Sequence, residues 1–182
     1  ANNTVIDAID KIRDTAASHN RLFFVEVVCR DSGCIALNAG VAGGAEAILL
    51  PEKDTAIEEL IDMLAQGATT HKSSMIVIVA EGDKNGGATN VAKRVKEKFD
   101  YFDTKVSILG HLQRGGSPSS FDRILATRMG YYAVKELLNG NSKSTIGFKG
   151  NKIVTTPLHV ALHSDVVKLD EDLLEISKVM SI

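Results

Sequence analysis

The segment at residues 110–118, GHLQRGGSP, combines a histidine, an arginine and two adjacent glycines. Glycines let a backbone approach a ligand closely, and a helix N-terminus presents unpaired N–H groups to an anion. His111 and Arg114 would add two side-chain donors, so the segment could hold a phosphate group. The alternative is a solvated turn at Gly115 and Gly116, and spacing alone does not separate the two interpretations.

Three further charged residues stand at the ends of apolar runs. Glu81 follows MIVIVA, and its carboxylate could accept hydrogen bonds from sugar hydroxyls, orient a metal ion or be solvated. Arg21 and Arg30 bracket LFFVEVVC, and the eight residues between them extend over roughly 30 Å. The two arginines therefore serve different sites or different subunits, unless both are surface cations.

Other patterns are weaker indications of chemistry. The glycines of AGVAGGAEA precede a predicted strand, whereas a dinucleotide-binding loop lies between a strand and a helix. Glu46 in that stretch could still bind a divalent cation. His159 and His163 could share a helical face, but no cysteine or carboxylate completes a zinc site. Cys29 lacks a convincing partner for a role as catalytic thiol.

The elements that must position these residues alternate between strand and helix. The apolar runs predict strands at 22–29, 45–52, 75–82 and 105–111. Helical spacing predicts helices at 4–17, 34–44, 55–67, 89–99, 119–138 and 170–180, and residues 145–158 resemble a hairpin that turns at 149–151.

This alternation predicts an α/β fold with a mostly parallel sheet covered on both faces by helices. Sites in such folds lie at the carboxyl ends of the strands. Arg30, Glu81, His111 and Arg114 all lie at or just beyond the carboxyl ends of predicted strands. We therefore expect them to converge on one site.

Composition limits the classes of function. The 182 residues carry 21 Lys+Arg and 23 Asp+Glu, a net charge of −2, which gives no overall attraction to nucleic acid or anionic membranes. No apolar stretch approaches the roughly 20 residues of a membrane span. Two cysteines are too few for a disulfide framework, so we expect a cytoplasmic protein with reduced thiols. No linker divides the sequence, so residues 1–182 are expected to form one piece.

Two long segments resemble a known family. VEVVCRDSGCIALNAGVAGGAEAILLPE resembles the 6-phosphofructokinase pattern VEVMGRxxGxLAL…AGGAE…PE, and LGHLQRGGSPSSFDRILATRMG resembles LGHxQRGG(S/T)P…DRxLAxxxG. The similarity covers nearly the whole chain and begins near the middle of a phosphofructokinase. The resemblance therefore implies that residues 1–182 are the carboxyl-terminal, sugar-binding half of a bacterial ATP-dependent enzyme, a three-layer sandwich without the amino-terminal nucleotide-binding domain.

The resemblance also implies roles for individual residues in binding fructose 6-phosphate. The implied set is Arg21, Val28, Cys29, Arg30, Glu81, Lys105, His111 and Arg114. Of these, Arg30 falls on the arginine that stabilises the transferring phosphoryl group, and Glu81 falls on the carboxylate that accepts fructose hydroxyls. His111 and Arg114 fall on the residues that hold the 6-phosphate.

Arg21 and Lys105 fall on residues that reach the sugar site of the neighbouring subunit, which resolves the separation of Arg21 from Arg30. An allosteric nucleotide pocket is implied at Arg13, Gly44, Ala45, Glu46, Lys72, Ser73 and Ser74.

The chain departs from the family pattern at three places. Val28 and Cys29 replace Met-Gly, and Lys105 replaces an arginine, which removes the bidentate fork. Thr70 replaces a basic residue of the effector pocket, which puts allosteric regulation in doubt.

The implied reaction transfers the γ-phosphoryl group of ATP to the 1-hydroxyl of fructose 6-phosphate, yields ADP and uses Mg²⁺. The catalytic base and the magnesium ligands belong to the half that this sequence lacks, so we expect no catalytic metal site here and no activity of the isolated 182-residue chain. The full-length enzyme is expected to be a homotetramer. Two alternatives stay open: a pyrophosphate-dependent phosphofructokinase, and a non-catalytic effector-binding or assembly module of the same fold.

Overall fold

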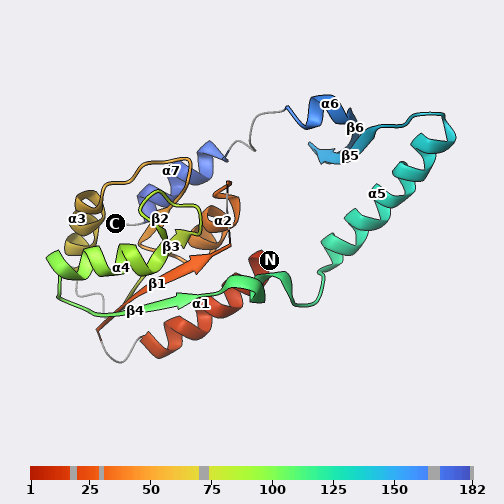
Figure 1. The fold of residues 1–182 in the computed structure, drawn as a ribbon. Helices are drawn as coiled ribbons and strands as arrows, with labels where there is room; N and C mark the ends of the chain where they lie inside the picture. Colours follow the sequence, from red (N-terminus) through yellow and green to blue (C-terminus); the bar gives the residue numbers. More distant parts are fainter. Residues whose placement is uncertain (17–19, 29–30, 70–73, 164–168, 181–182) are drawn as a thin grey trace. The chain divides into compact units, whose positions relative to one another are not determined.

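The computed structural model describes residues 1–16, 20–28, 31–69, 74–163 and 169–180. The chain forms two compact units, which we call the sheet unit (1–116 with 167–182) and the hairpin unit (117–166) (Figure 1). The sequence indicated no linker, but the chain passes from one unit to the other directly after Gly115-Gly116. The turn predicted there is therefore the boundary between two units.

A four-stranded parallel sheet forms the centre of the sheet unit, with strand order β2-β3-β1-β4. Its strands are β1 (Arg21–Val27), β2 (Ala47–Leu49), β3 (Ser74–Ala80) and β4 (Asp103–Ile108). Arg21 pairs with Ser74 on one side and Asp103 on the other, and Glu26 pairs with Val79 and Ile108. The carboxyl ends of β1, β3 and β4 therefore lie at one edge of the sheet.

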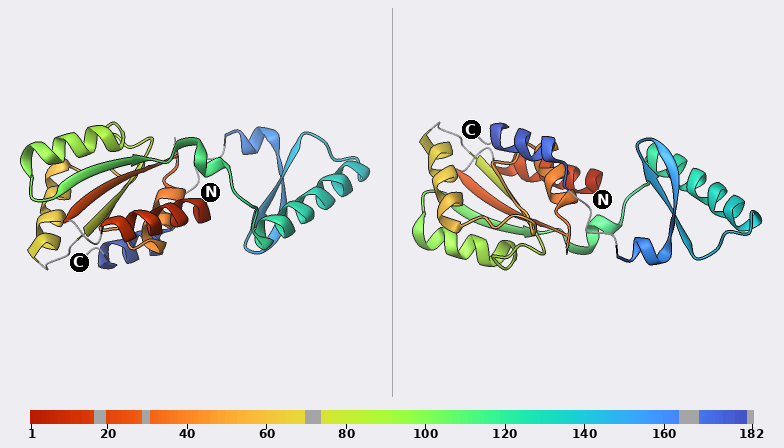
Figure 2. Two further views of the ribbon diagram at one scale, coloured as in Figure 1. Left: turned by 90° about the horizontal axis from the view of Figure 1, so that it is seen from below. Right: turned by 90° about the horizontal axis from the view of Figure 1, so that it is seen from above.

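Helices cover both faces of this sheet (Figure 2). They are α1 (Asn2–Ala16), α2 (Cys34–Ala42) and α7 (Glu171–Met180) on one face, and α3 (Ile57–Thr69) and α4 (Gly87–Lys98) on the other. Alternate side chains of β1 enter the two cores, because successive residues of a strand point to opposite faces. Phe23 and Val25 pack in the core between the sheet and helices α1 and α2. Leu22 and Phe24 pack in the core between the sheet and helices α3 and α4. The predicted three-layer α/β fold is confirmed.

The predicted strand at 105–111 is wrong at its end. β4 stops at Ile108, and a 3₁₀ helix, η1 (Gly110–Arg114), follows it. Gly110 has a φ of +50°, in the left-handed region that breaks an extended strand and favours glycine. His111 and Arg114 therefore project from a tight turn rather than from a strand.

The hairpin unit begins with α5 (Ser120–Leu138) and continues through β5 (Ser144–Lys149), β6 (Lys152–Pro157) and α6 (Leu158–Ala161). The turn joining β5 to β6 has positive φ at Gly150 and Asn151, as a two-residue hairpin turn requires, so the predicted hairpin is confirmed. Large apolar side chains of α5 are exposed: Phe121, Ile124, Tyr131, Val134, Leu137 and Leu138. Among the described residues, no helix is both long and apolar enough to span a membrane.

Candidate functional site

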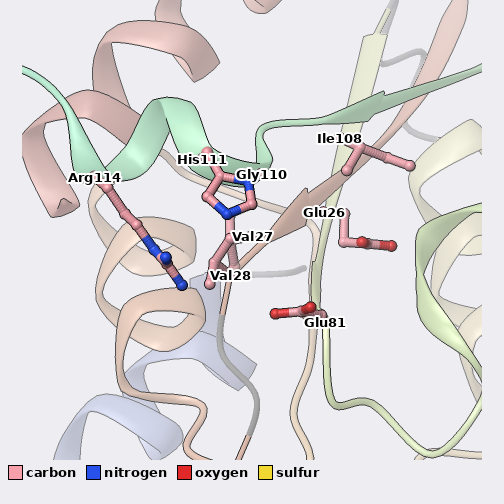
Figure 3. Close-up of a pocket in the computed structure, with 8 residues that line it drawn as sticks. All are labelled: Glu26, Val27, Val28, Glu81, Ile108, Gly110, His111 and Arg114. Carbon is pink, nitrogen blue, oxygen red and sulfur yellow. The ribbon is translucent and has the colours of Figure 1, made fainter.

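A cavity of about 350 Å³ opens at the carboxyl edge of the sheet (Figure 3). Its lining is Glu26, Val27, Val28, Glu81, Ile108, Gly110, His111 and Arg114. Its volume falls within the range of small-molecule sites, about 300–1,000 Å³. Because the cavity gathers Glu81, His111 and Arg114, the convergence predicted from the strand ends is confirmed for these three residues. Val28, implied only by the family resemblance, also lines the cavity.

Backbone hydrogen bonds hold the segments around the cavity together. The N–H of Glu81 donates to the Val27 carbonyl at 2.9 Å, and the N–H of Leu109 donates to the Glu26 carbonyl at 3.1 Å. These bonds continue the pairing of β1 with its neighbours past the ends of β3 and β4. The positions of Glu81 and of η1 are thereby fixed relative to β1.

The charged side chains divide the cavity into two parts. His111 and Arg114 lie on one side, and the carboxylates of Glu26 and Glu81 on the other (Figure 3). A basic pair suits a phosphate group, and carboxylates accept hydrogen bonds from hydroxyls. The arrangement fits a ligand that carries a phosphate at one end and hydroxyl groups at the other.

Two buried or partly buried residues of this region were missed by the sequence reasoning. Glu26 lies in β1, and its Oε2 accepts a hydrogen bond from the Ala88 N–H at 2.8 Å, at the start of α4. A carboxylate within the apolar run LFFVEVV was the signal that could have identified it. Gln113, between His111 and Arg114, is only 3% exposed, and its Oε1 accepts a hydrogen bond from the Val28 N–H.

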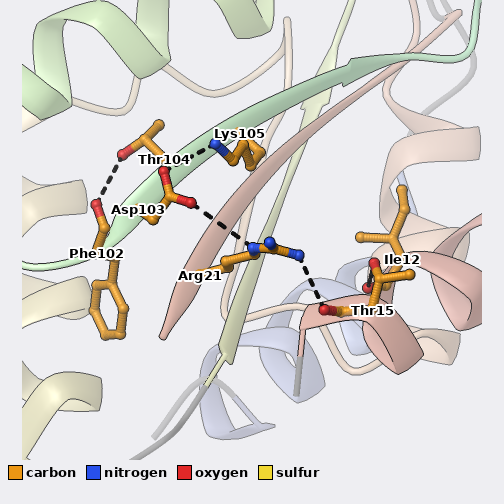
Figure 4. Close-up of polar contacts among 7 residues, drawn as sticks. All are labelled: Ile12, Thr15, Arg21, Phe102, Asp103, Thr104 and Lys105. Atoms are coloured by element: carbon orange, nitrogen blue, oxygen red, sulfur yellow. Dashed lines mark hydrogen bonds and ion pairs between the residues drawn. The ribbon is translucent and has the colours of Figure 1, made fainter. Parts of the chain in front are cut away.

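Arg21 and Lys105 lie at the opposite, amino-terminal edge of the sheet (Figure 4). Arg21 begins β1, whose seven residues span roughly 20 Å, and Lys105 precedes the cavity residue Ile108 by three residues, roughly 10 Å; neither residue lines the cavity. Both approach Asp103: Lys105 Nζ is 3.0 Å from Oδ1, and Arg21 Nε is 3.7 Å from Oδ2. The hydrogen bond from Lys105 is the main cause that lowers the pKa of Asp103, and the charges of Lys105 and Arg21 add to it.

Several predicted residues lie outside the described part of the chain. Cys29 and Arg30 follow Val28, and Lys72 and Ser73 precede β3. Their proposed roles stay predictions.

The described residues of the implied effector pocket are engaged within the protein. Arg13 Nη2 donates to the carbonyl oxygens of Gly43 and Gly44 at the end of α2, and Glu46 Oε2 accepts from the Ile76 N–H at 2.6 Å. Ala45 is buried.

A second cavity, of about 260 Å³, lies among β2, α3 and α7. Its lining includes Glu46 but not Arg13, Gly44, Ala45 or Ser74. Of the described effector residues, Glu46 alone lines this cavity, and the effector pocket stays a prediction.

The helix N-terminus expected to contribute to a phosphate site is capped by its own residues. Ser119 Oγ accepts from the Asp122 N–H, and Asp122 Oδ2 accepts from the Ser119 N–H at 2.8 Å at the start of α5. This capping box pairs the N–H groups of Ser119 and Asp122 within the helix itself. Within the described ranges, no group of three or more His, Cys, Asp or Glu side chains could hold a metal ion.

Comparisons with known proteins agree with this geometry. The phosphofructokinase family profile matches residues 1–137. ATP-dependent 6-phosphofructokinase 2 of Bacteroides thetaiotaomicron is 46% identical over 180 residues, and ATP-dependent 6-phosphofructokinase of Bacillus subtilis is 47% identical over 180 residues. Each match covers 99% of this chain and 55% of the relative, so the chain spans about half the length of these proteins.

Solved structures give the same result. The phosphofructokinase structure from Saccharomyces cerevisiae matches with a TM-score of 0.80 and 32% identity, over 99% of this chain and 25% of that one. A pyrophosphate-dependent phosphofructokinase from Marinobacter aquaeolei matches with a TM-score of 0.74 over 98% of this chain and 52% of that one; at 21% identity, it is similar in fold alone. Since the family profile covers most of the chain, the chain belongs to the phosphofructokinase family.

Proposed function

We propose that this chain supplies the sugar-phosphate site of an ATP-dependent 6-phosphofructokinase. The enzyme would transfer the γ-phosphoryl group of ATP to the 1-hydroxyl of fructose 6-phosphate in glycolysis, in the cytoplasm. The observation that carries this proposal is the cavity at the carboxyl edge of the sheet, where a basic pair faces two carboxylates. The names of the bacterial relatives, at 46% and 47% identity, support ATP as the donor.

The roles follow from the chemistry of the cavity. His111 and Arg114 would hold the 6-phosphate, and Glu81 would accept hydrogen bonds from fructose hydroxyls. Val28 would contact the sugar from the end of β1. Arg30, two residues further along the chain, would neutralise charge on the transferring phosphoryl group.

Phosphoryl transfer depends mainly on positioning the reactants in line and on neutralising charge. The described residues of this chain would position the sugar and fix its phosphate. They include no three-residue set of His, Cys, Asp or Glu side chains for Mg²⁺, so we assign no step to a metal here. Nucleotide, Mg²⁺ and catalytic base would be held by other parts of the full-length enzyme.

Arg21 and Lys105 would act on the sugar site of a neighbouring subunit in a homotetramer. Arg21 lies a full strand length from the cavity, and both side chains approach Asp103 rather than the cavity, which supports this proposal. Nucleotide regulation through Arg13, Gly44, Ala45, Glu46, Lys72, Ser73 and Ser74 rests on the family resemblance, and the hydrogen bonds of Arg13 and Glu46 give both side chains a structural role as well.

A coupled assay separates this proposal from a non-catalytic module. The intact natural protein should consume ATP in the presence of Mg²⁺ and fructose 6-phosphate, whereas the 182-residue chain alone should show no turnover. Replacing ATP by pyrophosphate in the same assay tests the donor. Absence of turnover and of fructose 6-phosphate binding in the intact protein would contradict the proposed function.

A further inference from the structure

Gln113 is turned away from the cavity that its neighbours line. It lies in η1 between His111 and Arg114, both exposed at the cavity. Gln113 itself is 3% exposed, whereas Leu112 beside it is 72% exposed. The 3₁₀ turn therefore presents two basic side chains to the cavity and anchors itself in the interior through the glutamine.

The anchor is one hydrogen bond across 85 residues of sequence. The Val28 N–H donates to Gln113 Oε1 at 2.6 Å. Val28 lies one residue beyond the end of β1, and β4 has already ended at Ile108. The N–H of Val28 is therefore not paired with a carbonyl group of β4. The side-chain amide of Gln113 takes the place that a strand carbonyl would occupy.

The orientation of the amide follows from its partner. A backbone N–H can only donate, so the oxygen of Gln113 must face Val28. Gln113 Nε2 is buried and has no hydrogen-bond partner within the described ranges. The bond to Val28 therefore ties the Gln113 side chain to the end of β1, and it adds to the Leu109–Glu26 backbone bond that already positions η1.

We propose that Gln113 is a positioning residue of the sugar-phosphate site. It sets the separation between the basic pair of η1 and the segment that leaves β1 at Val28. This inference rests on the proposed function, because it assigns Gln113 to the binding of fructose 6-phosphate. A displacement of η1 by a fraction of an ångström would misplace His111 and Arg114 together.

Two substitutions in the intact natural protein test this role. Gln113→Met keeps the length of the side chain and removes the amide, and Gln113→Asn keeps the amide on a side chain one methylene shorter. Both should raise the KM for fructose 6-phosphate by about tenfold. The KM for ATP should stay within about twofold, and kcat should fall by less than the sugar KM rises. Leu112 lies in the same turn but is exposed, so Leu112→Ala should leave both KM values and kcat unchanged.

The outcomes separate this inference from the proposed function. Thermal unfolding shows which variants fold; if Gln113→Met does not, Gln113→Asn decides. A sugar KM within twofold of the wild type in a folded variant overturns the positioning role and leaves the proposed function intact. Equal increases in the KM for ATP and for sugar would indicate general distortion and would also overturn it. If the wild type does not bind fructose 6-phosphate, both the function and the inference fail.

Discussion

The two edges of the parallel sheet carry similar charged side chains, but these pair with one another at one edge and face a cavity at the other. At the amino-terminal edge, Arg21 and Lys105 both approach the carboxylate of Asp103 (Figure 4). At the carboxyl edge, Arg114 and Glu81 face a cavity, and neither takes part in an ion pair in the described part of the chain (Figure 3).

Charge alone therefore does not identify a binding site. Each edge holds cations and a carboxylate, but at one edge they lie within ion-pair distance of one another in the chain. At the other edge, the backbone hydrogen bonds of Glu81 and Leu109 hold the charged groups apart around an open volume. We therefore expect substitutions at the carboxyl edge to affect the sugar site of their own subunit, and those at the amino-terminal edge to affect the site of a neighbouring subunit or local stability.

Arg114→Ala should have the largest effect. Hydrogen bonds between charged groups contribute about 1.5–3 kcal/mol, so the KM for fructose 6-phosphate should rise by about 10- to 100-fold. The 6-phosphate does not react, so kcat should change little. Steady-state kinetics of the intact protein measure both constants, and His111→Ala should act in the same direction. Lys11→Ala removes a cation paired with Asp7 on the surface of α1 and should leave the sugar KM unchanged. An unchanged sugar KM in Arg114→Ala would contradict the assignment of the cavity.

Arg21→Ala tests whether the amino-terminal edge acts across a subunit boundary. Its loss should raise the sugar KM by about tenfold, because Lys105 would still supply one cation. Assemblies formed from a mixture of Arg21→Ala and Arg114→Ala subunits should regain activity at low sugar concentration. Some sites in the mixture would combine an intact Arg114 from one subunit with an intact Arg21 from its neighbour. No recovery on mixing would place both arginines in the same subunit's site, or Arg21 in none.

Much of the fold could be predicted because its signals are local. The continuous apolar run before Glu81 identified β3 as a buried parallel strand, and the alternating core positions of Leu22 and Phe23 lie within a run that identified β1. The meeting of Glu81, His111 and Arg114 followed from the rule that parallel strands end at one edge.

The remaining features depend on contacts that sequence spacing does not contain. After the end of β4, Leu109 has helical dihedral angles (φ −75°, ψ −34°) and Gly110 a positive φ, and an isolated glycine in a strand pattern does not specify these conformations. Gln113 and Asp103 acquire their roles from Val28 and Arg21, which are 85 and 82 residues away along the chain. The division at Gly116 resembled an ordinary turn because a boundary with two glycines needs no long linker.

Gly87→Ala should reveal how closely the carboxyl edge is packed. Gly87 has a φ of +78°, and an added Cβ would lie 2.6 Å from Glu26 Oε2. Gly110→Ala is the matched control, because its φ is also positive but no atom lies within 4 Å of the added Cβ. Both substitutions should destabilise the protein through backbone strain of about 1 kcal/mol. Gly87→Ala should cost roughly 1 kcal/mol more, measured by urea unfolding, and equal losses would show that the contact with Glu26 relaxes freely.

Asp103→Asn should have the smallest effect, and pH gives it a recognisable sign. The hydrogen bond from Lys105, aided by the charges of Lys105 and Arg21, lowers the pKa of Asp103 in the folded protein. A carboxyl whose folded pKa is lowered stabilises the protein above its unfolded pKa of about 3.9, and this contribution is lost as pH falls through the folded value. Wild type should therefore unfold at a slightly higher urea concentration than Asp103→Asn near neutral pH, and the difference should vanish in acid. Because the group is exposed, added salt should also reduce the difference at neutral pH. If the difference in urea midpoint persists unchanged in acid and in salt, Asp103 acts through packing. The ionic contacts of Asp103 with Lys105 and Arg21 would then not stabilise the amino-terminal edge.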